Sequence, residues 1–137
     1  VDNSLISEIS GGYLLLWCVE KGDTPKDIET LTNKIINLRI FPDEQGKMNK
    51  SIIDANGEIL LVSQFTLSGN IQKGNRPSFI NSQDPEIAKK MIDDVAEIFS
   101  DRLTVKQGIF AALMEVSLIN DGPLTMFIES RDGKIQS

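Results

Sequence analysis

Short runs of apolar residues along the chain predict a set of strands. Residues 13–19, YLLLWCV, are uniformly apolar and are followed by charged residues and a glycine, which is typical of a buried strand. Residues 58–67, EILLVSQFTL, have the strongest strand pattern in the chain. Shorter runs predict three further strands at residues 104–107, 114–119 and 124–128. The sequence therefore indicates a sheet whose two best strands come before residue 70.

Two other segments have apolar residues at the spacing of amphipathic helices. The first can begin with Thr24 as its N-cap, Pro25 at its first position and Asp27 at capping-box spacing, and should end near Arg39. Its predicted apolar stripe consists of Ile28, Leu31, Ile35 and Leu38. The second should begin at the pair Asp84-Pro85. Its predicted buried residues are Ile87, Met91, Ile92, Val95 and Phe99.

Length and organisation favour one α/β domain that spans residues 1–137, with the two helices covering a sheet. We find no internal repeat, linker or low-complexity tract. No apolar run approaches the roughly 18 residues of a membrane span. No signal-peptide pattern opens the sequence, so we expect a soluble protein that does not associate with membranes.

Two residue counts limit the chemistry. Histidine is absent, which excludes histidine-based catalysis and most transition-metal sites, so we expect neither a metal nor a cofactor. Cys18, the single cysteine, lies in an apolar run, which favours a buried, inert thiol in a reducing compartment such as the cytoplasm. The net charge of −6 argues against extensive contact with nucleic acid. It leaves room for a local site that binds a short single-stranded end.

Three polar segments are candidate sites. Residues 63–66, SQFT, end the strongest strand, where they are either ordinary strand residues of alternating orientation or donors to a ligand. Residues 68–83 form a long loop rich in glycine, asparagine and proline. In it Lys73 and Arg76 come close to Phe79, which suits either a solvated loop or a phosphate beside a stacked base. The same two interpretations apply to Arg39 and Lys47, which are also next to turns.

The third segment is NDGP, residues 120–123, between the last two predicted strands. Pro123 cannot donate a ladder hydrogen bond, so it suits a simple hairpin poorly. Because only about 5–6% of X-Pro bonds are cis in folded proteins, the sequence alone does not predict a cis bond here.

Taken together, the motifs resemble those of the D-aminoacyl-tRNA deacylase family, which edits tRNA charged with D-amino acids. The motifs are NLRIF (37–41), GKMN (46–49), VSQFTL (62–67), KGNRPSF (73–79) and NDGPLT (120–125). They occur in the family's order and at the family's separations, and the resemblance covers essentially the whole chain.

The resemblance implies a three-layer β/β/α domain that forms a homodimer with its active sites at the interface. It places Ser63, Gln64, Phe65 and Thr66 at the floor of a catalytic pocket for the aminoacylated 3′-terminal adenosine of tRNA. It also implies a cis bond at Gly122-Pro123, inserted into the partner's pocket with its carbonyl groups facing the substrate. Phe79, Phe110 and Met114 are further candidates for the pocket lining, and Arg39, Lys47, Lys73 and Arg76 for tRNA contacts.

Chemistry without histidine or metal is feasible for an aminoacyl ester, which is already activated. Thr66 has no general base nearby in sequence, so we favour backbone N–H groups around Phe65 and Thr66 as oxyanion donors, with the Thr66 hydroxyl orienting the substrate. Water, or the neighbouring ribose hydroxyl of the substrate, would provide the rest of the chemistry, and the family's mechanism is described as assisted by the RNA itself. If the Gly122 and Pro123 carbonyl groups fill the space of an L side chain, L-esters are rejected and glycyl esters are accepted.

The chain departs from the family pattern at several points. Family members begin with a strand of about ten residues, usually containing Gln-Arg, before the position that matches Val1. Either this sequence starts inside a longer protein or that strand has been lost. In the family the arginine helps to brace the glycine-proline turn, so its loss would affect activity. Cys18 replaces a common glycine, and Gln107 replaces a common threonine ahead of Gly108. A non-catalytic module that binds nucleotides or nucleic-acid ends is therefore the alternative, whereas the intact SQFT and NDGPLT motifs favour the enzyme.

Overall fold

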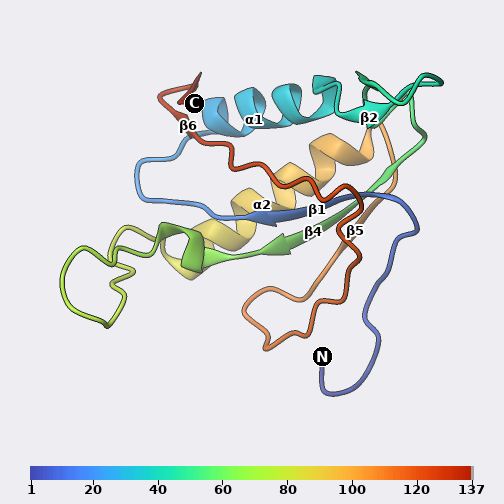
Figure 1. The fold of residues 1–137 in the computed structure, drawn as a ribbon. Coiled ribbons are helices and arrows are strands. Elements are labelled where there is room, and N and C mark those ends of the chain that lie inside the picture. Colours follow the sequence, from blue (N-terminus) through green and yellow to red (C-terminus); the bar gives the residue numbers. More distant parts are fainter. Residues whose placement is uncertain (137) are drawn as a thin grey trace.

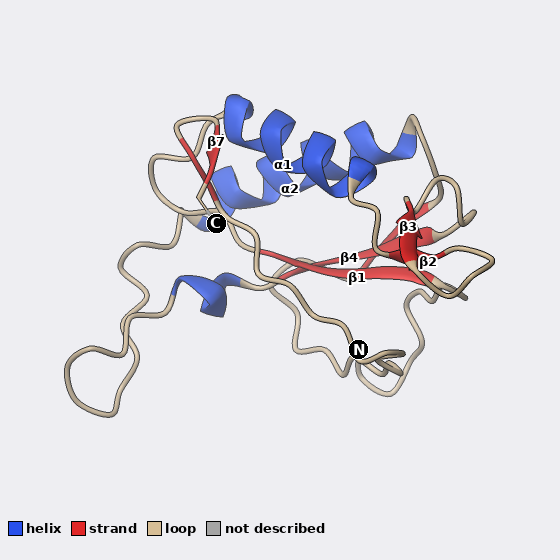
Figure 2. Cartoon of the chain, turned by 45° about the horizontal axis from the view of Figure 1, so that its top comes forward, coloured by secondary structure: helices blue, strands red, loops and turns tan. Residues whose placement is uncertain are grey.

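A computed structural model describes residues 1–136 and shows two helices packed against a three-stranded parallel sheet (Figures 1 and 2). The strands β1 (Gly12–Trp17), β4 (Glu58–Ser63) and β5 (Val105–Gln107) are adjacent in the order β1-β4-β5. The helices α1 (Pro25–Asn37) and α2 (Pro85–Ser100) lie side by side over one face of this sheet. The predicted α/β fold with two helices covering a sheet is thus confirmed.

Two antiparallel hairpins and a short 3-10 helix complete the fold. The first hairpin pairs β2 (Phe41–Pro42) with β3 (Met48–Lys50), and the second pairs β6 (Ser130–Arg131) with β7 (Lys134–Ile135). The 3-10 helix η1 (Phe65–Ser68) follows directly after β4. None of the helices formed by residues 1–136 is long and apolar enough to cross a membrane.

The hydrophobic core lies between the helices and the sheet. The parallel register pairs Gly12 with Glu58 and Trp17 with Ser63, so apolar residues of both strands face the helices at alternate positions. The most deeply buried side chains are Phe99, Ile52, Ile59, Leu61 and Val95. On α2 the buried residues are Ala88, Ile92, Val95, Ala96 and Phe99. The predicted burial of Ile87 is wrong: its side chain is 48% exposed, because it precedes Ala88 and points away from that stripe.

The strands predicted at residues 114–119 and 124–128 are not formed. Both segments lack ladder hydrogen bonds to any residue in the range 1–136, and a strand exists only when a neighbour supplies those bonds. Apolar alternation therefore identified two segments that are able to pair as strands. It did not show which other strand, if any, they would pair with. The strand predicted over residues 58–67 also ends early, at Ser63.

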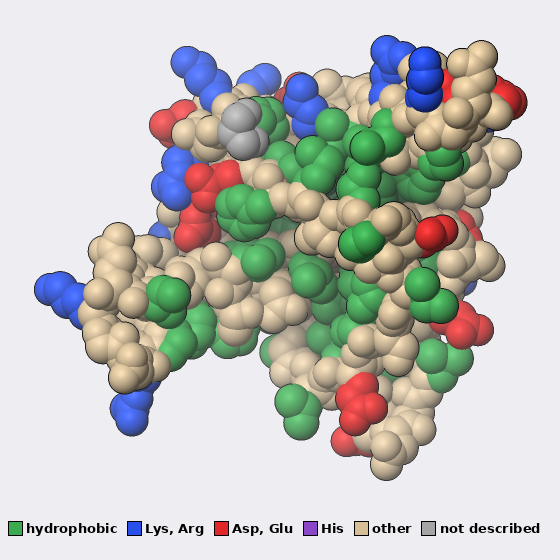
Figure 3. Space-filling model, in the orientation of Figure 1, with side chains coloured by type: hydrophobic (Ala, Val, Ile, Leu, Met, Phe, Trp, Pro, Cys, Tyr) green, Lys and Arg blue, Asp and Glu red, His purple; other side chains and the backbone are tan. Residues whose placement is uncertain are grey.

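A groove of about 2020 Å³ runs along the open edge of β1. Its walls include the segments 1–11 and 113–130, together with residues of β1, β4 and α1. Figure 3 shows apolar side chains gathered over this side of the molecule. Leu113 and Ile119 are the most exposed of them, at 94% and 93%. The structure thus presents a large apolar surface to its surroundings.

The carboxylate of Asp27 joins the C-terminal hairpin to α1. It is 4% exposed and accepts hydrogen bonds from the Ser130 hydroxyl at 2.6 Å, the Gly133 N–H at 2.8 Å and the Thr24 N–H at 3.1 Å. Burial alone would raise the pKa of Asp27, but these hydrogen bonds outweigh it and lower the pKa below the ordinary value of 3.8. The same residue therefore completes the predicted capping box and fixes the chain terminus.

Replacing Asp27 should destabilise the fold. Asp27→Ala leaves buried donors without an acceptor, and we expect a loss of about 3 kcal/mol in the free energy of unfolding at neutral pH, measured with urea. Because the folded pKa is lowered, this contribution is present above pH 3.8 and is lost as the pH falls through the folded pKa. The control Asp93→Ala removes an exposed pair with Lys89 and should cost less than about 1 kcal/mol. Equal effects of the two substitutions would contradict this role of Asp27.

Candidate active site

The SQFT segment forms a turn at the open end of the sheet. The Gln64 N–H donates to the Trp17 carbonyl at 2.7 Å, which is a backbone hydrogen bond between the end of β1 and the chain that leaves β4. The backbone then enters η1, closed by a hydrogen bond of 3.2 Å from the Leu67 N–H to the Gln64 carbonyl. Phe65 and Thr66 are therefore not strand residues, contrary to the plain strand interpretation, and both are exposed.

Backbone donors are available in this turn. Among residues 1–136, the N–H groups of Phe65 and Thr66 have no hydrogen-bond acceptor, whereas those of Gln64 and Leu67 are paired. Free N–H groups at an exposed turn can bind a carbonyl oxygen or an oxyanion. The Phe65 and Thr66 N–H groups, which the sequence suggested as oxyanion donors, are thus free to bind a ligand.

The Thr66 hydroxyl accepts a hydrogen bond of 2.6 Å from the Gln64 side-chain amide. Within the described residues, this amide is its only hydrogen-bond partner, so no carboxylate or amine is placed to remove its proton. Its own proton remains free to be donated to a ligand. This geometry suits a hydroxyl that orients a substrate.

Of the three pocket candidates, Phe79 lies at the site. Its ring packs edge-to-face against Phe65, with centroids 5.1 Å apart and an interplanar angle of 72°. Met114 lies next to Gly108 and Val62 and lines the groove. Phe110 packs against the hydrophobic core, beside a small hollow that Ser63 also lines. Phe79 and Phe65 together give an aromatic surface suited to a stacked base.

The Gly122-Pro123 bond is cis, as the resemblance implied. The turn is held by Asn120, whose side-chain oxygen accepts from the Leu124 N–H at 2.9 Å and whose amide donates to the Thr125 hydroxyl at 2.7 Å. Gly122 and Pro123 are exposed. In Figure 1 this turn, in orange-red, lies near the end of the sheet where β1 begins, whereas η1 follows the other end. One chain therefore does not bring the two motifs together.

The four candidate tRNA contacts lie in two groups. Arg39 and Lys47 belong to the β2–β3 region, where the Arg39 guanidinium donates to the Asn49 carbonyl at 3.0 Å and also contacts its side chain. Lys73 and Arg76 are exposed in the loop that follows η1. Figure 3 shows basic side chains around the edge of this face and none over its centre. The basic residues thus do not form one continuous patch.

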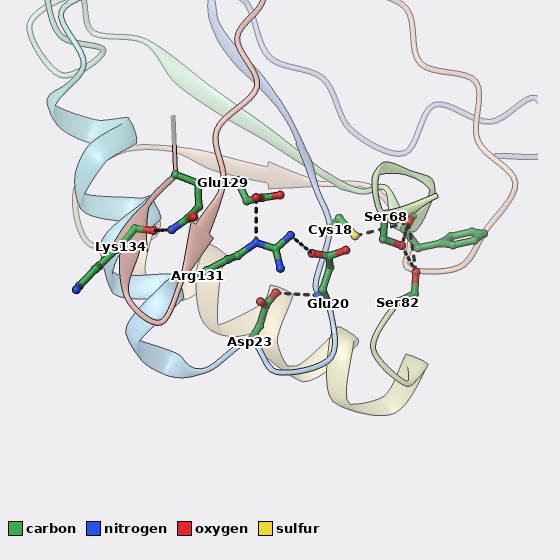
Figure 4. A network of polar contacts seen from close by, with 10 residues as sticks. Cys18, Glu20, Asp23, Ser68, Ser82, Glu129, Arg131 and Lys134 are labelled. Carbon is green, nitrogen blue, oxygen red and sulfur yellow. Dashed lines mark hydrogen bonds and ion pairs between the residues drawn. The ribbon is translucent and has the colours of Figure 1, made fainter. Parts of the chain in front are cut away.

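Sequence reasoning missed a cluster of donors behind η1, formed by Cys18, Ser68 and Ser82 (Figure 4). All three direct their side chains at the Phe65 carbonyl. Burial raises the pKa of the Cys18 thiol, so the thiol is protonated at neutral pH and acts as a donor. No motif or periodicity relates these positions, since tertiary structure alone brings them together.

Comparison with known proteins identifies the family. A sequence model described as D-Tyr-tRNA(Tyr) deacylase matches residues 1–129. Proteins named D-aminoacyl-tRNA deacylase from Persephonella marina and Clostridium tetani are each 50% identical over 96% of this chain and 89% of their own length. A relative with the same name from Nitratiruptor sp. is 48% identical, with the same coverage.

Solved structures share the fold. A protein described as c-Myc DNA Unwinding Element Binding Protein is 40% identical, with a TM-score of 0.90 over 95% of this chain and 89% of that one. A probable eukaryotic D-amino acid tRNA deacylase, 15% identical, covers 65% of this chain with a TM-score of 0.52 and supports the fold alone. The match over residues 1–129 and the identity of about half to full-length relatives lead to one conclusion: this chain belongs to the D-Tyr-tRNA(Tyr) deacylase family.

Proposed function

We propose that this chain hydrolyses the ester bond of D-aminoacyl-tRNA and releases free D-amino acid and tRNA. Membership of the family supports the reaction. The observation that assigns it to particular residues is that the N–H groups of Phe65 and Thr66, at the open end of β4, have no acceptor among residues 1–136. In this site the terminal base stacks near Phe65 and Phe79, and the ester carbonyl oxygen points at the two N–H groups.

The reaction then needs positioning more than acid–base chemistry. A water molecule, oriented by the neighbouring ribose hydroxyl of the substrate, attacks the carbonyl carbon, and negative charge develops on the carbonyl oxygen. The Phe65 and Thr66 N–H groups stabilise that charge, while the Thr66 hydroxyl, held by Gln64, orients the substrate. The ester C–O bond breaks, and the ribose oxygen takes up the proton that the nucleophile loses.

We propose further that two copies of the chain complete each site. The Gly122-Pro123 turn of one subunit would enter the η1 site of its partner, with its carbonyl groups in the space of an L side chain. Two observations support this arrangement: the turn and η1 are separated within one chain, and the surface that carries Leu113 and Ile119 is apolar and exposed. Glycyl esters lack a side chain, so the same filter would let glycyl-tRNA be hydrolysed.

Hydrolysis of paired enantiomeric substrates tests the function. D-Tyr-tRNA and L-Tyr-tRNA are incubated with the protein, and free tyrosine is followed over time. We expect release from D-Tyr-tRNA and glycyl-tRNA and little release from L-Tyr-tRNA. No release from any of them, together with measurable binding of uncharged tRNA, would instead identify a binding module on the same fold. The name of the DNA-binding relative keeps that second possibility relevant.

Phe65→Pro tests the backbone donors. Both Phe65→Pro and the control Phe65→Ala remove the aromatic ring, but only proline removes the N–H. Gln64 has φ −144° and ψ 76°, which is outside the helical region that a following proline disfavours. We expect kcat for D-Tyr-tRNA to be about 10²–10³ lower in Phe65→Pro than in Phe65→Ala. Equal kcat values would show that this N–H takes no part in catalysis.

Gly122→Ala/Pro123→Ala tests the chirality filter. We expect L-Tyr-tRNA hydrolysis to rise at least about 10-fold, the effect of removing a clash of about 1.4 kcal/mol, while D-Tyr-tRNA is still hydrolysed. The control Gly22→Ala/Pro25→Ala also replaces a positive-φ glycine and a proline, and both of its positions are exposed. Continued rejection of L-Tyr-tRNA by the first variant would place the filter elsewhere.

Salt dependence tests the basic loop. If Lys73 and Arg76 contact phosphates of the single-stranded 3′ end, Lys73→Ala/Arg76→Ala should weaken tRNA binding and reduce the slope of log K against log salt by about 1.4. The control Lys89→Ala/Lys90→Ala removes the same charge from α2, where both lysines pair with aspartates. The same comparison made with Arg39→Ala/Lys47→Ala tests the other basic group. Identical slopes for loop and control variants would reduce Lys73 and Arg76 to ordinary surface charges.

A further inference from the structure

Three segments that are distant in sequence converge on one backbone carbonyl, that of Phe65. Cys18 follows the last residue of β1, Ser68 belongs to η1 and Ser82 belongs to the chain that enters α2. Their donor atoms lie 3.6, 2.8 and 3.4 Å from the Phe65 oxygen, and the two serine hydroxyl groups also contact each other (Figure 4). A single backbone carbonyl rarely needs so many donors to be satisfied.

The number of hydroxyl protons determines which group donates to which oxygen. Each serine hydroxyl has one proton, and the Ser68 hydroxyl makes the shorter bond to the Phe65 carbonyl. Ser82 can therefore donate to the Ser68 oxygen, which gives a chain from Ser82 through Ser68 to Phe65. Hydrogen bonds in such a chain polarise and strengthen one another. Cys18 adds a weaker thiol donor to the same acceptor.

The Phe65 carbonyl matters because it shares a rigid peptide unit with the Thr66 N–H. In a trans peptide the C=O and the N–H point in opposite directions, so fixing one fixes the other. The donors behind η1 hold the carbonyl on the protein side. The Thr66 N–H, which has no acceptor among residues 1–136, must then face away from them, toward the exposed side of the turn.

We propose that Ser68 and Ser82 are positioning residues that aim the Thr66 N–H at the substrate carbonyl. This inference rests on the proposed function, since it needs an oxyanion for that N–H to stabilise. Neither serine touches the substrate: both act through the Phe65–Thr66 peptide unit. Loss of either hydroxyl lets this unit rotate, and the donor then points less accurately at the charge that develops in the transition state.

The Ser82 hydroxyl is not needed to hold the surrounding backbone in place. Backbone bonds on both sides of Ser82 already join its segment to the chain after β1, from the Lys21 N–H to the Asn81 carbonyl at 2.9 Å and from the Gln83 N–H to the Val19 carbonyl at 3.0 Å. The Ser82 N–H itself donates to the Phe79 carbonyl at 3.0 Å. Replacing the Ser82 hydroxyl should therefore change the site more than it changes the fold.

The experiment compares Ser82→Ala and Ser68→Ala with Ser82→Thr and the control Ser100→Ala. Ser100→Ala also removes one bond from a serine hydroxyl to a carbonyl, that of Ala96 at 2.7 Å, but at the far end of α2. We measure kcat and KM for D-Tyr-tRNA, the melting temperature, and the NMR shifts of the Phe65 carbonyl carbon and the Thr66 amide nitrogen. Those shifts report the hydrogen bond to this peptide unit without any need for catalysis.

We expect kcat to fall about 10-fold in Ser68→Ala and somewhat less in Ser82→Ala, with KM changed less than about twofold. Ser82→Thr, which restores a hydroxyl, should recover most of the activity, and Ser100→Ala should match the wild type. The Phe65 and Thr66 resonances should shift in the two site variants alone.

Two results would overturn the inference. One is an active wild-type protein whose kcat is unchanged in both alanine variants. The other is a loss of kcat in Ser82→Ala that Ser82→Thr does not restore, or that only follows a lower melting temperature. A wild-type protein without activity would reject the proposed function instead, and unshifted Phe65 and Thr66 resonances in the variants would then show that the serines do not hold this peptide unit.

Discussion

The hydrogen bond from the Gln64 N–H to the Trp17 carbonyl is the contact on which the site depends. This backbone hydrogen bond joins the end of β1 to the chain leaving β4, and the following residues turn out of the sheet into η1. Because the strands are parallel and packed under two helices, the end of β4 is rigid, so the turn begins from a fixed position. The free N–H groups, the Thr66 hydroxyl and the aromatic pair all take their places from it.

A site of this kind explains how a chain without histidine can belong to a family of ester hydrolases. In the proposed mechanism the substrate ester supplies its own reactivity, and the protein supplies N–H donors directed at the oxygen on which charge will develop. Such donors need the correct orientation rather than a particular basicity. In the proposed mechanism, Ser68 and Ser82, which would orient the turn, therefore matter as much as the residues that contact the substrate. In the proposed dimer, the second subunit would also cover the apolar surface along the groove.

Local signals were enough to predict the helices and their starts, because Pro25 and Asp84-Pro85 act within one turn of the chain. The pattern at residues 114–128 could not be converted into strands, since a ladder needs a partner that the pattern does not specify. The cis bond at Gly122-Pro123 followed from family resemblance and not from the residues alone. The role of Ser68 and Ser82 could not be predicted for a different reason. Both serines contact the Phe65 carbonyl, and no sequence pattern indicates this contact.

The most direct test of the shared site is a mixed dimer of one Phe65→Pro subunit and one Gly122→Ala/Pro123→Ala subunit, isolated with two affinity tags. Its only active η1 belongs to the subunit with the altered turn and receives the intact turn of its partner. The account predicts that this dimer hydrolyses D-Tyr-tRNA and rejects L-Tyr-tRNA. Hydrolysis of L-Tyr-tRNA at the rate of the Gly122→Ala/Pro123→Ala protein, per active η1, would show that the filter acts within one chain and would contradict it.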